Sequence, residues 1–175
     1  MLINLSDVLS SEDKVVKLHP EIEMEQFETQ VDQYPIVEKT PCSITLVNKG
    51  KKVIELTGQV NLTFSIPCGR CLEEVKVPIF VEFQRELDMK LSEEDRIKEL
   101  DESQYLSGYK LDVDKLVYNE ILVNWPMRVL CSEDCKGICN RCGTNQNHNH
   151  CDCDKSDLDP RMAVISDIFN KFKEV

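Results

Sequence analysis

The chain has 175 residues with a formal net charge of −11, and 41% of its residues are apolar against 30% charged. This length fits one domain with a real core, or a domain of about 120 residues that carries a small metal-stapled appendage. The acidic balance argues against a protein that holds DNA or RNA by its phosphates, since such binding needs a surface with surplus Lys and Arg. An acidic protein is better suited to binding basic partner proteins.

The sequence contains no signal for a membrane or for secretion. It has no run of about 18 consecutive apolar residues, which a transmembrane helix needs. Its first residues, MLINLSDVLSSEDK, lack the basic region and the long apolar run of a secretion signal. We therefore expect a cytoplasmic protein with no membrane contact. In a reducing cytosol, the nine cysteines predict metal binding or redox chemistry rather than a framework of disulfides.

Short strands are predicted in the N-terminal part of the chain, at residues 1–5, 14–18 and 22–27. The pattern is clearer from Pro41 onward, because Cys42, Ile44 and Leu46 lie on one face of an extended segment. This position predicts that Cys42 is a buried and unreactive thiol. Residues 48–51 have turn chemistry and lead into the next strand.

Two long strands are predicted next, at about residues 54–66 and 75–84. Apolar side chains occupy every second position in both: Ile54, Leu56, Val60, Leu62, Phe64 and Ile66 in the first, and Val75, Val77, Ile79, Val81 and Phe83 in the second. This period of two predicts an antiparallel pair with one wet face. Gly58 interrupts the apolar row and predicts a bulge. The connection Cys68-Gly69-Arg70-Cys71 predicts a CxxC zinc knuckle at the tip of the hairpin.

Two helices and an acidic loop complete the predicted elements. Residues 91–109 contain the run SEEDRIKELDES without an apolar period, and they predict a mobile loop. Asp112 is expected to cap a helix that ends near Trp125, because Pro126 disfavours helix in the residue before it. A second helix is predicted from Asp159, with Pro160 at its first position and an apolar stripe from Met162 to Phe172. We expect both helices to pack on the sheet, although the second stripe could instead meet another molecule.

Eight of the cysteines form four pairs, and eight thiolates are two sets of four. The pairs are Cys68/Cys71, Cys131/Cys135, Cys139/Cys142 and Cys151/Cys153. The segment from Cys139 to Cys153 is compact enough to complete one tetrahedral site by itself, so Cys131 and Cys135 are predicted to join the hairpin pair in a second site. Sets of four thiolates leave no open coordination position, which predicts two structural zinc ions rather than catalytic ones.

Several alternatives use the same residues differently. His148 or His150 could replace one of the last two cysteines in a Cys₃His site, or both could be exposed loop residues. An iron–sulfur cluster would also accept four thiolates. A thiol redox protein is disfavoured because the CGRC pair lies between two strands instead of opening a helix. With three histidines in the chain, no Cys/His catalytic set stands out, so we expect a protein that is not an enzyme.

The residues predict an α+β fold with two parts. Residues 1–130 are expected to form an antiparallel sheet domain with a packed helix and the CxxC hairpin. Residues 131–175 are expected to form a cysteine-rich, zinc-binding segment followed by the second packed helix.

The order of these motifs resembles the YceD family, the large ribosomal RNA subunit accumulation proteins. The resemblance rests on Cys68-Gly69-Arg70-Cys71-Leu72, on Cys135-Lys136-Gly137-Ile138-Cys139, on Cys142-Gly143 with Asn145 and Asn147, and on Asp159-Pro160-Arg161. It implies a bacterial, non-enzymatic factor for the synthesis, processing or accumulation of large-subunit ribosomal RNA. It also implies that the hairpin site is common to the family and that the site at residues 139–153 is an addition.

From this resemblance and the acidic charge, we expect a zinc-stapled scaffold that binds a basic ribosomal or assembly protein, or a pre-ribosomal particle. Polar residues of the metal loops could offer contacts to RNA or could make only local hydrogen bonds: Arg70, Asn140, Arg141, Asn145 and Asn147. The rival interpretations are a zinc ribbon that itself binds ribosomal RNA, a thiol redox protein and a metal-dependent hydrolase.

Overall fold

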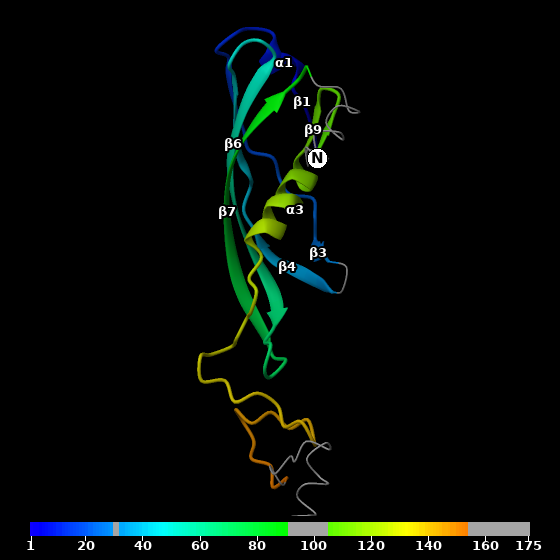
Figure 1. Cartoon of the computed structure of the whole chain (residues 1–175), viewed down its shortest axis with the longest axis vertical. Helices are drawn as coiled ribbons and strands as arrows, with labels where there is room; N and C mark the ends of the chain where they lie inside the picture. The colour runs from blue at the N-terminus through cyan, green and yellow to red at the C-terminus, as the bar shows by residue number, and fades with distance from the viewer. Residues whose placement is uncertain (30–31, 91–104, 154–175) are drawn as a thin grey trace, which may run out of the picture.

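The computed structural model describes residues 1–29, 32–90 and 105–153, and its elements are shown in Figure 1. In chain order they are β1 (Leu2–Asn4), α1 (Ser6–Leu9), β2 (Val15–Leu18), β3 (Gln26–Glu28), β4 (Gln33–Lys39), β5 (Ser43–Asn48), β6 (Val53–Pro67), β7 (Glu74–Asp88), β8 (Leu106–Ser107), β9 (Lys110–Asp112) and α3 (Val113–Asn124). The predicted antiparallel sheet is confirmed. The predicted second helix, at residues 159–172, lies outside the described residues.

All strand pairs in the described residues are antiparallel. The larger sheet has the order β2-β5-β6-β4-β3, and β7 pairs with β6 as its further strand. A second, three-stranded sheet has the order β1-β9-β8 and joins the N-terminus to the start of α3. β4 and α1 were not predicted from the sequence.

β6 and β7 form a hairpin that runs the full length of both strands. Their register continues without a shift from Val53 opposite Asp88 to Pro67 opposite Glu74. The even-numbered apolar residues of β6 are buried on one face, as the alternation predicts. Polar residues such as Gln59 and Asn61 lie on the other face, which is wet. The two strands therefore form one continuous two-stranded ribbon whose tip lies far from the core.

The prediction that Gly58 marks a bulge is wrong, because Gly58 pairs with Phe83 in unbroken register. The glycine is needed for a different reason. A Cβ at Gly58 would lie 2.4 Å from Cζ of the Phe83 ring, so the ring occupies the space that any other side chain would fill. The register shift in the sheet occurs instead in β4, between Ile36 and Glu38.

α3 covers the apolar face of the sheet, as the sequence predicts. The Asp112 side chain accepts a hydrogen bond from the backbone N–H of Lys115 and caps the helix. Leu116, Val117 and Ile121 are buried in the same core as β6. Arg85 of β7 forms an ion pair of 2.8 Å with the buried carboxylate of Glu120 on α3.

The end of α3 is held by aromatic packing. Trp125, the first residue beyond the helix, stacks on Phe27 with ring centroids 4.6 Å apart. It also meets Phe64 of β6 edge-on, with centroids at 5.3 Å. Trp125 thereby fixes the point from which the chain leaves the core.

Part of the predicted acidic loop belongs to the described residues. Residues 91–104 lie outside them, but residues 105–109 are described, and the first two of these lie against the core. Tyr105 and Leu106 are buried, and Leu106–Ser107 forms β8 by pairing with β9. The predicted mobility of this loop stays a prediction, but residues 105–107 are not the solvated loop that the local sequence indicates, because they are buried or paired with β9.

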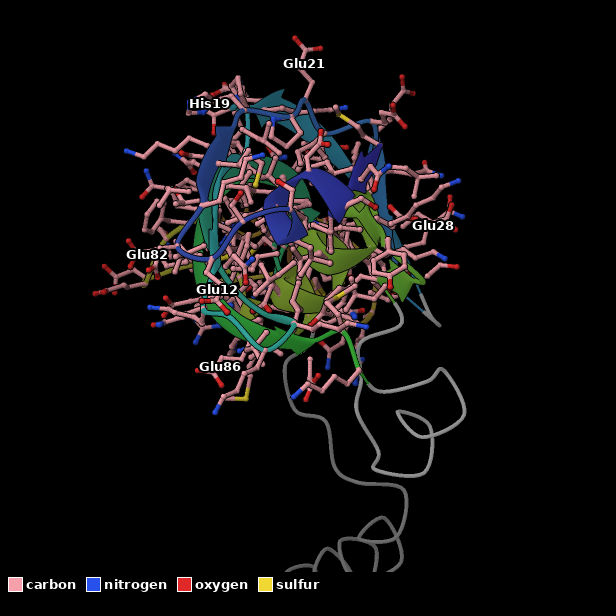
Figure 2. The ribbon with its side chains drawn as sticks, turned by 90° about the horizontal axis from the view of Figure 1, so that it is seen from above. Glu12, His19, Glu21, Glu28, Glu82 and Glu86 are labelled. Atoms are coloured by element: carbon pink, nitrogen blue, oxygen red, sulfur yellow. The ribbon has the colours of Figure 1, made fainter. Side chains whose placement is uncertain are left out.

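The cysteine-rich segment extends the molecule beyond the hairpin. Figure 1 shows that the chain after α3 runs beside the β6–β7 hairpin to its tip and that the segment in yellow and orange lies past the tip. Figure 2, viewed from above, shows Glu82 and Glu86 pointing outward from the sheet domain. Among the described residues, none of the helices combines the length and the apolarity that crossing a bilayer would require.

Replacing Gly58 by Ala is expected to lower the free energy of unfolding by about 1–3 kcal/mol, because the added methyl displaces the Phe83 ring from a packed core. Urea unfolding of the purified protein measures the change. The same substitution should cost less in a Phe83→Leu background. An equal cost in both backgrounds would show that the ring is not the reason for the glycine.

Candidate metal centres

The turn between β6 and β7 forms a compact CxxC knuckle. The backbone N–H of Cys68 donates to the carbonyl of Glu73 (2.8 Å), and that of Leu72 donates to the carbonyl of Cys68 (3.0 Å). These bonds return the chain on itself at the residue where β6 ends. Both thiols are buried at the tip, with Cys68 fully buried. The long strands thus place two sulfur ligands at the end of a rigid hairpin.

The segment after α3 supplies the other half of this site. Gly69 donates its N–H to the carbonyl of Val129 (2.9 Å), and the backbone N–H of Cys131 lies 3.3 Å from Sγ of Cys68. Sγ of Cys68 is 3.8 Å from Sγ of Cys135. Sγ of Cys71 is 3.5 Å from Sγ of Cys131. The cysteine sulfur atoms of the hairpin therefore lie in contact with those of the segment that follows α3.

The Arg70 backbone docks closely against Gly137. A Cβ at Gly137 would lie 2.9 Å from the Arg70 carbonyl oxygen, and Gly137 has φ +78°, so this position suits glycine on two grounds. The same carbonyl accepts the N–H of Ile138 (3.0 Å). The Arg70 guanidinium in turn donates to the carbonyls of Glu133 (3.2 Å) and Cys135 (2.9 Å). Arg70 thus joins the two halves of the site from both its backbone and its side chain.

A second turn forms between Cys139 and Thr144. The N–H of Cys139 donates to the carbonyl of Thr144 (2.8 Å), and the N–H of Gly143 donates to the carbonyl of Cys139 (2.8 Å). Cys151 and Cys153 return to this turn. The second set is less covered than the first, because Cys142 is exposed and the last two thiols are half-buried.

The eight thiols converge in two sets of four, and each set could hold a metal ion. The sets are Cys68, Cys71, Cys131 and Cys135, and Cys139, Cys142, Cys151 and Cys153, with all sulfur atoms of a set within 4.8 Å of one another. Four ligands at the Zn–S distance of about 2.3 Å in a tetrahedron lie about 3.8 Å apart. The sulfur separations of 3.5 and 3.8 Å in the hairpin set fit that geometry.

In each set, the surroundings lower the thiol pKa of two cysteines and raise that of the other two. At Cys68, desolvation works to raise the thiol pKa, but the backbone amides of Cys71, Arg70 and Cys131 outweigh it and lower the pKa to about 6. At Cys142, the hydroxyl and the backbone N–H of Thr144 lower the pKa to about 6. Within the same set, contact with Cys142 raises the pKa of Cys153 to about 12. A thiolate at one cysteine therefore opposes deprotonation of the next, and a divalent cation would offset this repulsion.

Cys42 belongs to neither set. It is fully buried beside Ile44 in the sheet core, and desolvation raises the pKa of its thiol to about 11. Its neutral form is therefore kept at physiological pH, as an apolar core residue requires.

The two candidate histidine ligands lie apart from the sulfur atoms. Nε2 of His148 is 2.7 Å from Oε1 of Glu73, and this contact lowers the pKa of the Glu73 carboxyl. His150 is 86% exposed and lies 3.9 Å from Asp152. In the described residues, the C-terminal set is therefore made of four cysteines, and the Cys₃His arrangement has no support from the geometry.

Most of the polar residues predicted as partner contacts are used inside the metal segment. Oδ1 of Asn147 accepts the N–H of Lys136 (2.7 Å), and its Nδ2 donates to Sγ of Cys135 (3.3 Å). Oδ1 of Asn145 accepts the N–H of Asn147 (2.9 Å). The spacing of the cysteines indicates none of these bonds, so sequence analysis missed the second layer of the site.

Asn140 and Arg141 are exposed on the C-terminal turn, and each has an interaction within the chain. A contact of either residue with RNA or a protein therefore stays a prediction.

Both sets lie within a region that matches a known family. The family model described as large ribosomal RNA subunit accumulation protein YceD matches residues 56–169, which include all eight of these cysteines. The chain belongs to the YceD family. The resemblance stated from the sequence is thus confirmed.

A curated relative covers most of the chain. The chloroplastic large ribosomal RNA subunit accumulation protein YCED homolog 1 of Arabidopsis thaliana is 24% identical over an alignment of 170 residues, and the match covers 82% of this chain and 53% of the relative. The chain therefore spans about half the length of this YceD relative. No solved structure matches the chain.

Replacing Asn147 by Ala is expected to weaken metal binding at the hairpin set by about 10–100-fold, because the change removes the N–H donor to Cys135 Sγ and the acceptor for Lys136. Competition with a chromophoric chelator measures the affinity. Asn149→Ala, at an exposed position of the same loop, is the matched control and should bind metal like the wild type. Equal affinities of the two variants would contradict a supporting role for Asn147.

Proposed function

We propose that this chain is a non-enzymatic factor for the synthesis, processing or accumulation of large-subunit ribosomal RNA, and that two structural zinc ions hold the surface by which it binds its partner. The family match supports this proposal, because it extends over both sets of cysteines. Both candidate metal sites therefore lie within the region that the family shares.

Single metal ions suit the geometry of both sets. A cluster of several irons and sulfides inside four thiolates would hold the sulfur ligands further apart than one ion does. All sulfur atoms of each set lie within 4.8 Å, which supports one ion per set. Among single ions, four thiolates in a closed tetrahedral set are the usual ligands of structural zinc.

The same arrangement supports a structural role for the metal. Four protein sulfurs fill a tetrahedral ion, so no position remains for a water or a substrate. The CxxC pair of Cys68 and Cys71 follows a strand, whereas thiol oxidoreductases place such a pair at a helix N-terminus. We therefore propose that the chain acts by binding, and that it does so in the cytoplasm.

The charge of the chain supports a basic protein as the partner. The formal net charge is −11, and each zinc with four thiolates adds a centre of net charge −2. Proteins of the large subunit bind RNA and therefore carry surplus Lys and Arg. We propose that the chain binds such a protein, free or on a pre-ribosomal particle, and that it does not bind RNA by its phosphates or DNA.

Protein purified without added metal is expected to contain two zinc ions per chain, and the variants Cys68→Ser and Cys139→Ser are each expected to contain about one. The reason is that each substitution removes one ligand from a different set of four. Elemental analysis measures the metal, and Cys42→Ala is the control that should keep both ions. Iron in place of zinc, or loss of both ions from Cys68→Ser, would contradict one zinc ion per set.

Deleting the gene is expected to lower the amount of large-subunit ribosomal RNA relative to small-subunit ribosomal RNA. Wild-type protein and Cys42→Ala should restore the ratio, whereas Cys68→Ser should not, because it loses the metal that joins the hairpin to the segment after α3. Quantitative electrophoresis of total RNA measures the ratio. An unchanged ratio in the deletion would overturn the proposed function.

A further inference from the structure

The two CxxC turns of the chain have the same backbone structure. In each, the first cysteine donates its N–H to the carbonyl five residues ahead, Glu73 in the hairpin turn and Thr144 in the C-terminal turn, with 2.8 Å in both cases. The residue directly after the second cysteine donates its N–H back to the carbonyl of the first cysteine. The two turns are therefore one motif used twice, and they can be compared position by position.

The comparison isolates one residue, Leu72. The position after the second cysteine has a left-handed backbone in both turns, with φ +64° at Leu72 and φ +72° at Gly143. Glycine adopts this conformation readily, whereas a bulky side chain is rarely found in it. The C-terminal turn has the residue that the backbone favours, and the hairpin turn has one that it disfavours.

Leu72 is not explained by packing within the chain. Its side chain is 65% exposed, although it is apolar and adjoins the buried thiol of Cys71. A leucine that filled the core could offset its backbone strain by burial, but this one remains in water. Strained residues that the fold itself does not need are concentrated at binding and catalytic sites. The turn geometry explains the positive φ, and it leaves the choice of leucine unexplained.

We infer that Leu72 is the anchor through which the hairpin tip binds a basic protein, with the leucine side chain entering an apolar pocket of that partner. This inference rests on the proposed function for the partner's place in the cell. The backbone bonds of Cys68 and the docking of Arg70 against Gly137 hold the tip rigidly, so the anchor is presented in a fixed position. An anchor that is held rigidly before binding loses little entropy on binding.

The charge around Leu72 determines the class of partner. Glu73 and Glu74 follow it in the chain, and Glu133 and Asp134 lie on the segment bonded to the tip through Arg70. The Arg70 guanidinium is turned to two backbone carbonyls. An apolar anchor in an acidic rim fits an apolar pocket with a Lys- and Arg-rich rim. RNA is a poor fit, because an aliphatic side chain offers neither an aromatic face for stacking nor a donor for a base edge.

The test compares zinc-loaded wild-type protein with Leu72→Gly and Leu72→Asn. The probes are single purified proteins extracted without RNA from large ribosomal subunits, and calorimetry or biolayer interferometry measures each affinity. We expect the wild type to bind at least one of them and both variants to bind it at least about 10-fold more weakly. Zinc content should be unchanged and the melting temperature within a few degrees of the wild type, because Gly and Asn accept a positive φ.

Val123→Ala is the matched control, since Val123 is an apolar residue that is 77% exposed on α3 with ordinary helical backbone. It should bind like the wild type. Binding by both Leu72 variants within about 2-fold of the wild type would overturn the inference. So would a wild-type protein that binds none of the extracted proteins, or one that binds only the extracted RNA.

Complementation of the gene deletion in cells distinguishes a failure of this inference from a failure of the proposed function. If the deletion lowers large-subunit ribosomal RNA and Leu72→Gly restores it as fully as the wild type does, the anchor is wrong and the function stands. If the deletion leaves the RNA unchanged, the function is wrong, and the affinities of the Leu72 variants for the purified proteins still decide the anchor.

Discussion

The structure of the hairpin tip and of residues 131–153 depends on the convergence of eight thiols into two sets of four. The apolar cluster at the hairpin tip consists of three cysteines with Val75 and Leu130 packed against them, which is far too small to be a core. A structural zinc supplies about 10–16 kcal/mol in small zinc modules, an amount comparable to the whole stability of a typical domain. Metal binding can therefore order residues 131–153 where hydrophobic burial cannot.

The sheet domain places half of the ligands of the hairpin set, Cys68 and Cys71, at a distance from the core. β6 and β7 hold one register over their whole length, so their tip carries Cys68 and Cys71 in a fixed direction. The other two ligands of the set follow α3, whose end Trp125 ties to the aromatic core. The hairpin and the segment after α3 both start from the sheet core, and the four thiols join them again beyond its edge. This makes the hairpin tip rigid while Leu72 at the tip stays exposed.

The parts of this architecture that depend on local pattern could be predicted, and those that depend on distant partners could not. Period-two alternation and the Asp112 cap indicated β6, β7 and α3, and cysteine spacing grouped the thiols as they converge. β4 was not predicted, and Pro35 argues against a strand there, yet β4 pairs with β3 through its first half, up to Pro35, and with β6 from Ile36 onward. Gly58 was misread because a glycine gap under a ring and a bulge look alike in sequence.

The second set of thiols does more than close its own loop. Asn147 and His148 lie between its ligands in the chain, and both reach back to the hairpin site, one to Sγ of Cys135 and the other to the Glu73 carboxylate. A hydrogen bond to a ligand sulfur orients the ligand and tunes its charge. The C-terminal set thus positions supporting contacts of the hairpin set. Because the dependence runs in that direction, an ion at the C-terminal set would make the hairpin site and its exposed tip more rigid, while the C-terminal turn itself keeps a glycine and presents no apolar side chain at the equivalent position.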